Sequence, residues 1–319
     1  MDKLDQHHHK SHRIGLLLLP DFAMMSYAAL VEPMRAANIL ADRELYQMIN
    51  IGATRAAIAS SGAAMVTPQT SISDVPKLDY LFVIAGGNPA NYANKRVFTW
   101  LARMSRQGIT LGGVSGGPFI LAKAGLMEGR RITVHWEHAE AMSEISPQLL
   151  LEHSLFVIDR DRVTSAGGTA AMDLMHFLIT QHHGRKFARL VSDWFMHTET
   201  RPSAGPQRAG LVQRIGTKSP AVLDAVQAME ANVGSPLSLV RLAEIAAISP
   251  RQLNRLFRDN LGRTVMQYYR VLRLEKASNL MRNSPLSLTE IALATGFAGS
   301  AHFSRAYSEH FGKPPSANR

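Results

Sequence analysis

Short apolar runs alternate with longer amphipathic stretches over the first two thirds of the chain. The six apolar residues at 14–19 have the length of a buried strand, and the apolar spacing over 26–40 predicts a helix. Further strands are predicted over 80–87 and 109–117, and a hairpin-like strand pair over 154–168. Helical patterns follow the last two of these regions. Strands that alternate with helices predict a parallel α/β sheet covered on both faces.

A change of pattern near residue 200 divides the chain. The segment 200–210 contains two prolines, two glycines and almost no large apolar residue, which is typical of a linker. Beyond it the strand pattern ends, and helices joined by short turns are predicted. We therefore expect four parts, namely a disordered tail over 1–12, an α/β domain over 13–199, a linker over 200–217 and an all-helical domain over 218–319.

The helical part contains an internal repeat. The pentapeptide SPLSL occurs at 235–239 and again at 284–288, an offset of 49 residues. After the following turn the offset becomes 50, and the paired residues are then Leu253 with Phe303, Phe257 with Tyr307 and Gly262 with Gly312. One structural unit therefore occurs twice, with one extra residue in the turn of the second copy.

Each copy has the features of two short helices joined by a tight turn. Serine and proline open the first helix, a small alanine permits close packing, and a glycine ends the second helix. This pattern is typical of a helix-turn-helix, whose second helix enters the DNA major groove. The helix predicted over 264–283 has a central part of about 27 Å. It would hold the two second helices about one DNA turn, or 34 Å, apart.

Positive charge is concentrated in the same region. Of the net charge of +10, residues 210–319 contribute +7 and residues 1–209 only +3. This asymmetry predicts a polyanionic partner. No apolar run approaches the roughly 20 residues that a membrane span needs. The chain has no cysteine, which excludes disulfides and thiolate chemistry and fits a reducing cytoplasm.

Residues 220–319 resemble the DNA-binding domain of AraC/XylS-type transcriptional regulators. The matching segments are LAEIAAISPRQLNRLFRDNLG, YYRVLRLEKASNLM and LTEIALATGFAGSAHFSRAYSEHFGKPPS. The resemblance implies recognition helices over 250–260 and 300–310. The candidates that face the groove are Arg251, Asn254, Arg255, Ser300, Ser304 and Arg305. Leu253, Phe257, Phe303 and Tyr307 are expected in the core. Arg255 and Arg305 either bond guanine or contact phosphate, and both alternatives stay open.

The α/β part contains a serine in the spacing of a nucleophile elbow. Gly113, Ser115 and Gly117 form G-x-S-x-G, in which a strained strand-to-helix turn exposes a hydroxyl. Gly86 and Gly87 end another predicted strand at the same edge of the sheet. Ligands of parallel α/β sheets bind beyond the carboxyl ends of the strands. The glycines therefore predict a small-molecule site at this edge.

The sequence around this serine resembles the class I glutamine amidotransferase-like (PfpI/ThiJ-type) fold, in the branch fused to AraC-type domains. The matching segments are EPMRAAN, AGGNP, the elbow, GRRITVHWEH and TSAGGTAAMDLMHFLI. The resemblance implies a flavodoxin-like α/β sheet. In enzymes of this fold the elbow carries a cysteine beside a histidine and an acid, and Ser115, His135 and Glu32 match these positions. The ligand-binding candidates are Glu32, Gly87, Asn88, Ser115, Gly116, His135 and Trp136.

The same residues suit the recognition of a zwitterion. Backbone N–H groups at the elbow favour a carboxylate, while Glu32 and the face of Trp136 favour a cation. Regulators of this branch sense such compounds, so the resemblance implies an amino acid, glycine betaine or carnitine. Two alternatives stay open: Trp136 packs in the core, and Glu32 forms a structural ion pair with Arg35.

We therefore expect a cytoplasmic, ligand-responsive activator that binds double-stranded DNA and a small-molecule effector. We expect it to dimerise through the α/β domain and, by family resemblance, to contact RNA polymerase. No catalytic residue, cofactor, metal or membrane is expected. One rival is a serine hydrolase or amidase fused to a DNA-binding domain, which the high pKa of a serine hydroxyl disfavours at a position built for cysteine. The other is an architectural DNA-binding protein without an effector.

Overall fold

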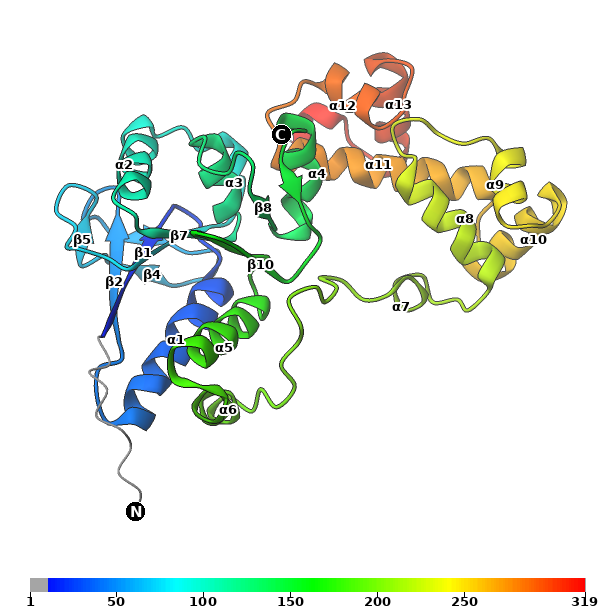
Figure 1. Ribbon diagram of the computed structural model, residues 1–319. Coiled ribbons are helices and arrows are strands. Elements are labelled where there is room, and N and C mark those ends of the chain that lie inside the picture. The colour runs from blue at the N-terminus through cyan, green and yellow to red at the C-terminus, as the bar shows by residue number, and fades with distance from the viewer. Residues whose placement is uncertain (1–10, 319) are drawn as a thin grey trace. The chain divides into compact units, whose positions relative to one another are not determined.

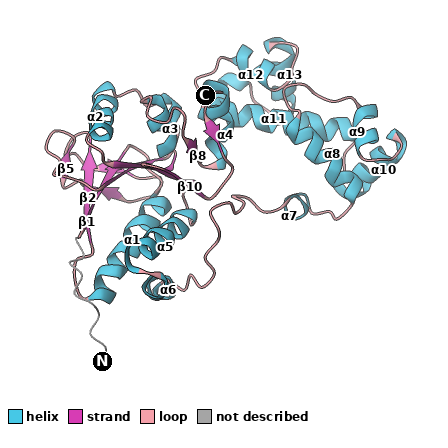
Figure 2. Cartoon of the chain, in the orientation of Figure 1, coloured by secondary structure: helices cyan, strands magenta, loops and turns pink. Residues whose placement is uncertain are grey.

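The computed structural model describes residues 11–318, which divide into two compact units between Gln207 and Arg208. The strands all belong to the first unit, and the second is helical (Figure 2). The predicted succession of an α/β domain and an all-helical domain is confirmed. Most of the expected tail, including the histidines at 7–9, lies outside the described residues, and His12 is already the first residue of strand β1.

A seven-stranded sheet forms the centre of the described α/β unit. Its order is β10-β11-β7-β6-β1-β2-β5, and every neighbouring pair is parallel except β10 with β11. The strands are β1 (His12–Leu18), β2 (Tyr46–Gly52), β5 (Thr70–Ser71), β6 (Tyr80–Ala85), β7 (Thr110–Ser115), β10 (Phe156–Asp159) and β11 (Arg162–Ser165). Two short pairs are separate from this sheet, β3 (Ile58–Ala59) with β4 (Met65–Val66) and β8 (Arg131–Ile132) with β9 (Leu150–Leu151).

Helices cover both faces of this sheet (Figure 1). One face packs against α1 (Met24–Ala41) and α5 (Ala170–His183), on which α6 (Arg185–Trp194) lies, and the other against α2 (Lys95–Arg106) and α3 (Gly117–Lys123). Buried side chains such as Leu16, Phe82 and Val114 form one core with α1, α5 and α6. The remaining elements of the unit are α4 (Trp136–Ile145) and a 3-10 turn, η1 (Pro89–Asn91).

The segment that follows α6 is fastened to the α/β unit. The buried Asp173 carboxylate accepts hydrogen bonds from His197 Nε2 and from the backbone N–H and Nε of Arg201, each at 2.9 Å. Gln207 Nε2 donates to two backbone carbonyls of the same unit. The first part of the predicted linker, 200–217, therefore packs on the sheet domain.

Short helices make up the second unit. They are α7 (Leu211–Ile215), α8 (Pro220–Ala231), α9 (Leu239–Ile245), α10 (Pro250–Leu261), α11 (Val265–Asn283), α12 (Leu288–Ala294), α13 (Ser300–Phe311) and a 3-10 turn, η2 (Pro315–Asn318). Arg214 of α7 pairs with Glu230 of α8, so the second part of the predicted linker belongs to this unit. The four predicted core residues are fully buried, as expected: Leu253, Phe257, Phe303 and Tyr307. No helix in the described part of the chain is long and apolar enough to cross a bilayer.

The two helix-turn-helix copies differ in their turns as the repeat predicts. Residues 246–249 join α9 to α10, and residues 295–299, one more, join α12 to α13. Both turns contain left-handed backbone, at Ala247 (φ 52°) and Gly296 (φ 73°). Glycine is needed in the second turn, because a β-carbon on Gly296 would lie 2.6 Å from the ring of Pro236.

The N-caps of α9 and α12 differ from the prediction that serine and proline open the first helix of each copy. Ser238 accepts a hydrogen bond from the N–H of Arg241, and Ser287 accepts one from the N–H of Glu290. The second serine of each SPLSL segment is therefore the N-cap. The proline precedes the helix instead of occupying its first turn.

Glycines allow α3 to start directly against the sheet. A β-carbon on Gly117 would lie 1.9 Å from the carbonyl oxygen of Val83 in β6. A β-carbon on Gly113 would lie 2.6 Å from the backbone nitrogen of Pro118. The turn between β7 and α3 is thus fixed by backbone packing on both sides.

A cluster of histidine and tyrosine side chains closes the opposite edge of the sheet, where β1, β2 and β6 begin. His182 Nδ1 lies 2.9 Å from the Tyr46 hydroxyl and Nε2 lies 3.1 Å from the Tyr80 hydroxyl. The His182 ring stacks on His12 with centroids 4.0 Å apart. Burial, with smaller contributions from His12 and His183, lowers the pKa of His182 to about 4. The folded protein therefore keeps this imidazole neutral at pH 7.

Replacing Gly117 by alanine should lower the free energy of unfolding of the α/β unit by about 1–3 kcal/mol, because the added carbon overlaps a backbone carbonyl. Thermal unfolding followed by circular dichroism measures the effect. Gly62→Ala is the matched control, since its added carbon meets only Ser60 Oγ at 3.8 Å. Equal melting temperatures for Gly117→Ala and wild type would mean that α3 can move away from β6 without cost.

The depressed pKa of His182 predicts that acid weakens the α/β unit. The unfolded histidine titrates near 6.5 and the folded one near 4, so the unfolded state binds more protons between these values. The free energy of unfolding should fall as the pH is lowered through this window. In urea unfolding, His182→Gln should show a shallower fall than wild type. Identical slopes would assign the acid sensitivity to other groups.

Candidate functional site

Strand β7 ends at Ser115 in a strained elbow. The φ of Ser115 is 60°, a left-handed conformation that costs about 1–2 kcal/mol for a residue with a β-carbon and often marks a functional site. The residue is 6% exposed. Its hydroxyl has no hydrogen-bond partner among the described residues, so it is available to a ligand.

Two residues that sequence reasoning did not nominate lie beside the elbow. A β-carbon on Gly167 would lie 2.6 Å from Ser26 Oγ and 2.8 Å from Ser115 Cβ, so both serines flank this glycine. Ser26 is buried in the first turn of α1, and its Oγ accepts the N–H of Gly168 at 2.8 Å. In the sequence, the glycine pair that follows β11 was the feature that could have indicated this part of the site. No sequence feature marked Ser26 as part of the site, because serine is common wherever a helix begins.

His135 is oriented as a hydrogen-bond donor. It is the N-cap of α4, where its Nδ1 accepts the N–H of Glu137 at 3.3 Å, and its backbone N–H donates to the Ser115 carbonyl at 3.2 Å. Burial lowers the pKa of His135 and so favours the neutral ring. Because Nδ1 accepts a hydrogen bond, the proton of the neutral ring lies on Nε2. That nitrogen can donate to a ligand but cannot take a proton from Ser115.

The sequence left open whether Glu32 pairs with Arg35 and whether Trp136 packs in the core, and the structure shows both side chains. Glu32 accepts a hydrogen bond from Arg35 Nε at 2.9 Å, which is the structural ion pair. It follows Ser26 by six residues on α1, which places it about 9 Å further along the axis and about 120° around the helix. Trp136 is 40% exposed, with its ring centroid 5.4 Å from that of His135. The indole is therefore a surface aromatic beside His135, not a core residue.

The remaining predicted ligand residues lie on turns around the elbow. Gly87 has a φ of 55° in the turn after β6, and Asn88 Oδ1 accepts the N–H of Ala90, which caps η1. The N–H of Gly116 donates to the Ala85 carbonyl at 3.1 Å. This N–H was expected to attract a carboxylate, but it is already occupied within the sheet.

In the helical unit, the predicted groove-facing arginines lie on α10 and α13. Arg251, Arg255 and Arg305 are exposed and have no carboxylate partner in the part of the chain that the structure describes. Arg241 and Arg270, outside these helices, pair with glutamates. Uncompensated charge therefore lies on the two recognition helices, where α13 also carries the half-buried Ser300 and Ser304.

Asn254 has a structural contact that the sequence did not indicate. It is half-buried, and its Oδ1 accepts the N–H of Val265 at 3.1 Å, which fastens α10 to the start of α11. Further along α11, Arg273 Nε donates to the Thr295 carbonyl at 2.7 Å, and its guanidinium carbon lies 4.2 Å from the centre of the Phe297 ring. Helix α11 thus bonds to α10 of the first copy and to the turn of the second copy.

Comparisons with protein families match both units. The model of the DJ-1/PfpI family matches residues 13–181, and a helix-turn-helix domain model matches residues 242–319. Among solved structures, an AraC family transcriptional regulator from Pseudomonas putida is 26% identical with a TM-score of 0.53. The match covers 58% of this chain and 99% of that one. A ThiJ/PfpI family protein from Pseudomonas syringae shares the fold at 18% identity, with a TM-score of 0.53 over 77% of this chain and 95% of that one.

Relatives of similar length match almost the whole chain. The HTH-type transcriptional regulator GlxA of Rhizobium meliloti is 44% identical over 96% of this chain and 95% of its own length. The regulators CdhR and GbdR of Pseudomonas aeruginosa are 39% and 38% identical, and the matches cover 95% and 96% of this chain and 90% and 83% of theirs. The chain therefore belongs to the AraC-type helix-turn-helix transcriptional regulators that carry an N-terminal DJ-1/PfpI domain.

Proposed function

We propose that this regulator binds a small zwitterion at the elbow and that occupancy changes how the helical unit binds DNA. The observation that carries the proposal is the state of His135. The elbow keeps its strained backbone, but the neighbouring imidazole holds its proton on Nε2 and accepts at Nδ1. A preorganised group of donors without a base is suited to recognition.

The donors favour a carboxylate. The Ser115 hydroxyl, the Ser26 hydroxyl and His135 Nε2 each have a proton to give, and hydrogen bonds to a charged acceptor contribute about 1.5–3 kcal/mol each. The exposed face of Trp136 beside His135 would attract a cation. An amino acid, glycine betaine or carnitine carries both charges. Glu32, which is paired with Arg35, is not needed for this arrangement.

The same contacts count against a hydrolase. A serine nucleophile needs a base that accepts its proton and an acid that orients the base. Here Nδ1 of His135 accepts a backbone N–H, whereas in a triad Nδ1 would donate a hydrogen bond to the acid. Ser115 therefore lacks an activating base in this arrangement.

On the DNA side, we propose that Arg251, Arg255 and Arg305 contact the major groove or its phosphates, with Ser300 and Ser304 beside them. Asn254 would read a base only through its amide nitrogen, since its oxygen bonds Val265. We further propose activation through RNA polymerase, a homodimer formed by the α/β unit, and action in the cytoplasm, where bacterial DNA lies. A ligand can shift the balance between DNA-binding states only by its differential affinity for them.

Thermal-shift measurements with glycine betaine, carnitine and the amino acids test the ligand site. One compound should raise the melting temperature, since ligand binding to the folded state stabilises it. Ser115→Ala should weaken that compound's binding by about tenfold through the loss of one charged hydrogen bond. Ser143→Ala, on the exposed side of α4, is the matched control and should bind like wild type.

The same experiment separates the rivals. The ligand should be recovered chemically unchanged after incubation with the protein. If it is consumed, and Ser115→Ala stops this, the protein is a hydrolase. If no compound raises the melting temperature, the architectural reading stands and the effector proposal fails.

Duplexes selected by the full-length chain from a random library test the DNA contacts. Arg305→Ala should weaken binding to the selected duplex by about 1–3 kcal/mol if this residue bonds a base, and the loss should be smaller on random duplex. Equal loss on both would reassign Arg305 to phosphate. Affinity should fall steeply with added salt. Arg55→Ala, in an ion pair on the α/β unit, is the control and should leave binding unchanged.

A further inference from the structure

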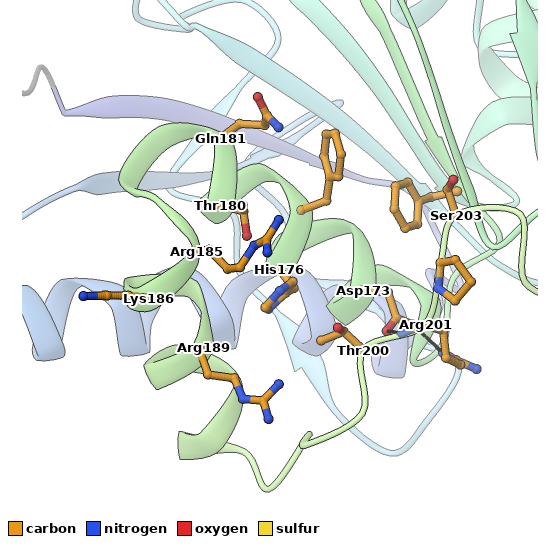
Figure 3. A pocket seen from close by; sticks show the side chains of 13 residues that line it. Asp173, His176, Thr180, Gln181, Arg185, Lys186, Arg189, Thr200, Arg201 and Ser203 are labelled. Carbon is orange, nitrogen blue, oxygen red and sulfur yellow. Dashed lines mark hydrogen bonds and ion pairs between the residues drawn. The ribbon is translucent and has the colours of Figure 1, made fainter.

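A cavity of about 880 Å³ lies in the α/β unit and includes none of the elbow residues. Helix α5 contributes Phe177 and Thr180, and α6 contributes Arg185 and Arg189. Residues 200–203, on the way to the helical unit, close another side (Figure 3). The volume is in the range of about 300–1,000 Å³ that small-molecule sites occupy.

One wall of this cavity is aromatic. Phe177 is 38% exposed, and its ring lies 5.8 Å from that of Phe156 at an angle of 51°. Pro202 adds a further apolar surface. An exposed aromatic face inside a cavity favours a flat apolar group that can stack on it.

The other wall is cationic and has an unused hydroxyl. Arg185 has no carboxylate partner among the described residues, whereas Arg189 forms an ion pair with Asp193 at 3.7 Å. Figure 3 shows Arg185 directed back toward Thr180 and His176, whereas Lys186 points away from them. Thr180 Oγ1 is buried and has no hydrogen-bond partner among residues 11–318. Since a buried hydroxyl without a partner is costly, rotation of the Thr180 side chain toward a ligand acceptor would be stabilising.

The acidic group in the cavity does not cancel this charge. Asp173 is fully engaged by His197 and Arg201, and Arg201 also donates to Thr169 Oγ1 at 2.8 Å. The Asp173–Arg201 pair is neutral by itself and Arg189 is paired with Asp193, so Arg185 leaves the cavity with a net positive charge. The cavity thus combines a flat apolar wall with an uncompensated positive one.

We propose that this cavity binds an organic anion with a planar apolar body. Its acid group lies between Arg185 and Thr180, and its ring lies on Phe177. Because Arg201 and Pro202 form part of the wall, the bound anion also restrains the segment that leads to the helical unit. The regulator would then have a second input that is independent of the elbow.

Calorimetric titration of the full-length protein with 2-naphthoate tests the site. We expect one molecule to bind per chain, while neutral 2-naphthol, which has the same ring system, binds at least about tenfold more weakly through the loss of the charged contact. Arg185→Gln and Thr180→Val should each weaken naphthoate binding by about tenfold for the same reason. Titration with 2-naphthyl phosphate distinguishes an aryl phosphate from a carboxylate ligand, because the better-matched anion binds more tightly.

Arg43→Gln is the matched control, since Arg43 is exposed on the same unit and lies outside the cavity. It should leave naphthoate binding unchanged. Equal weakening by Arg43→Gln and Arg185→Gln would overturn the proposal in favour of general charge attraction, as would the absence of binding to wild type. A crystal structure with 6-bromo-2-naphthoate locates the ligand independently. A bromine signal beside Ser115 instead of Phe177 would also overturn the proposal and would leave the elbow as the sole site.

Discussion

The left-handed backbone of Ser115 is surrounded by closely packed chain. At three neighbouring glycines there is no room for a β-carbon. Gly113 packs on the start of α3, Gly117 on the Val83 carbonyl, and Gly167 on Ser26 and on Ser115 itself. The carboxyl ends of β6, β7 and β11 therefore meet at one fixed point. A hydroxyl fixed in this way loses little conformational entropy when it binds a ligand, because the cost was met when the chain folded. The geometry that positions a nucleophile in enzymes thus serves equally well to position a donor.

In the helical unit, the corresponding constraint is that two helix-turn-helix copies are held together. The long helix α11 does this with polar contacts at separate places, through Val265 to Asn254 and through Arg273 to the turn of the second copy. Gly296 lets that turn approach Pro236, so the copies also touch directly. Side chains used for this internal fastening are unavailable to DNA. The exposed arginines of α10 and α13 named above make none of these internal contacts.

Local pattern predicted most of the fold, and contacts distant in sequence account for what it missed. Apolar spacing located β1, β6, β7 and the β10–β11 pair but missed β2 and β5, the repeat located the second helix of each copy, and the extra turn residue was visible in the offset. Ser26 was not predicted because its place in the site depends on Gly167, far along the chain. Glu32 was favoured because an acid was expected at its position. Asn254 stays a predicted groove-facing residue, but its bond to Val265 could not be read from the sequence. The cavity beside Phe177 is formed by three separate segments, and no motif marks it.

The serine at the elbow also differs from a cysteine in its response to oxidants. A low-pKa thiol at such a turn is open to stepwise oxidation by peroxide, first to a sulfenic acid and then to irreversible products. A hydroxyl has no equivalent oxidation states, and the whole sequence contains no cysteine that could supply one. The elbow therefore keeps the same hydrogen-bonding character in oxidising and reducing cells. The proposed ligand site therefore has no thiol that peroxide could modify.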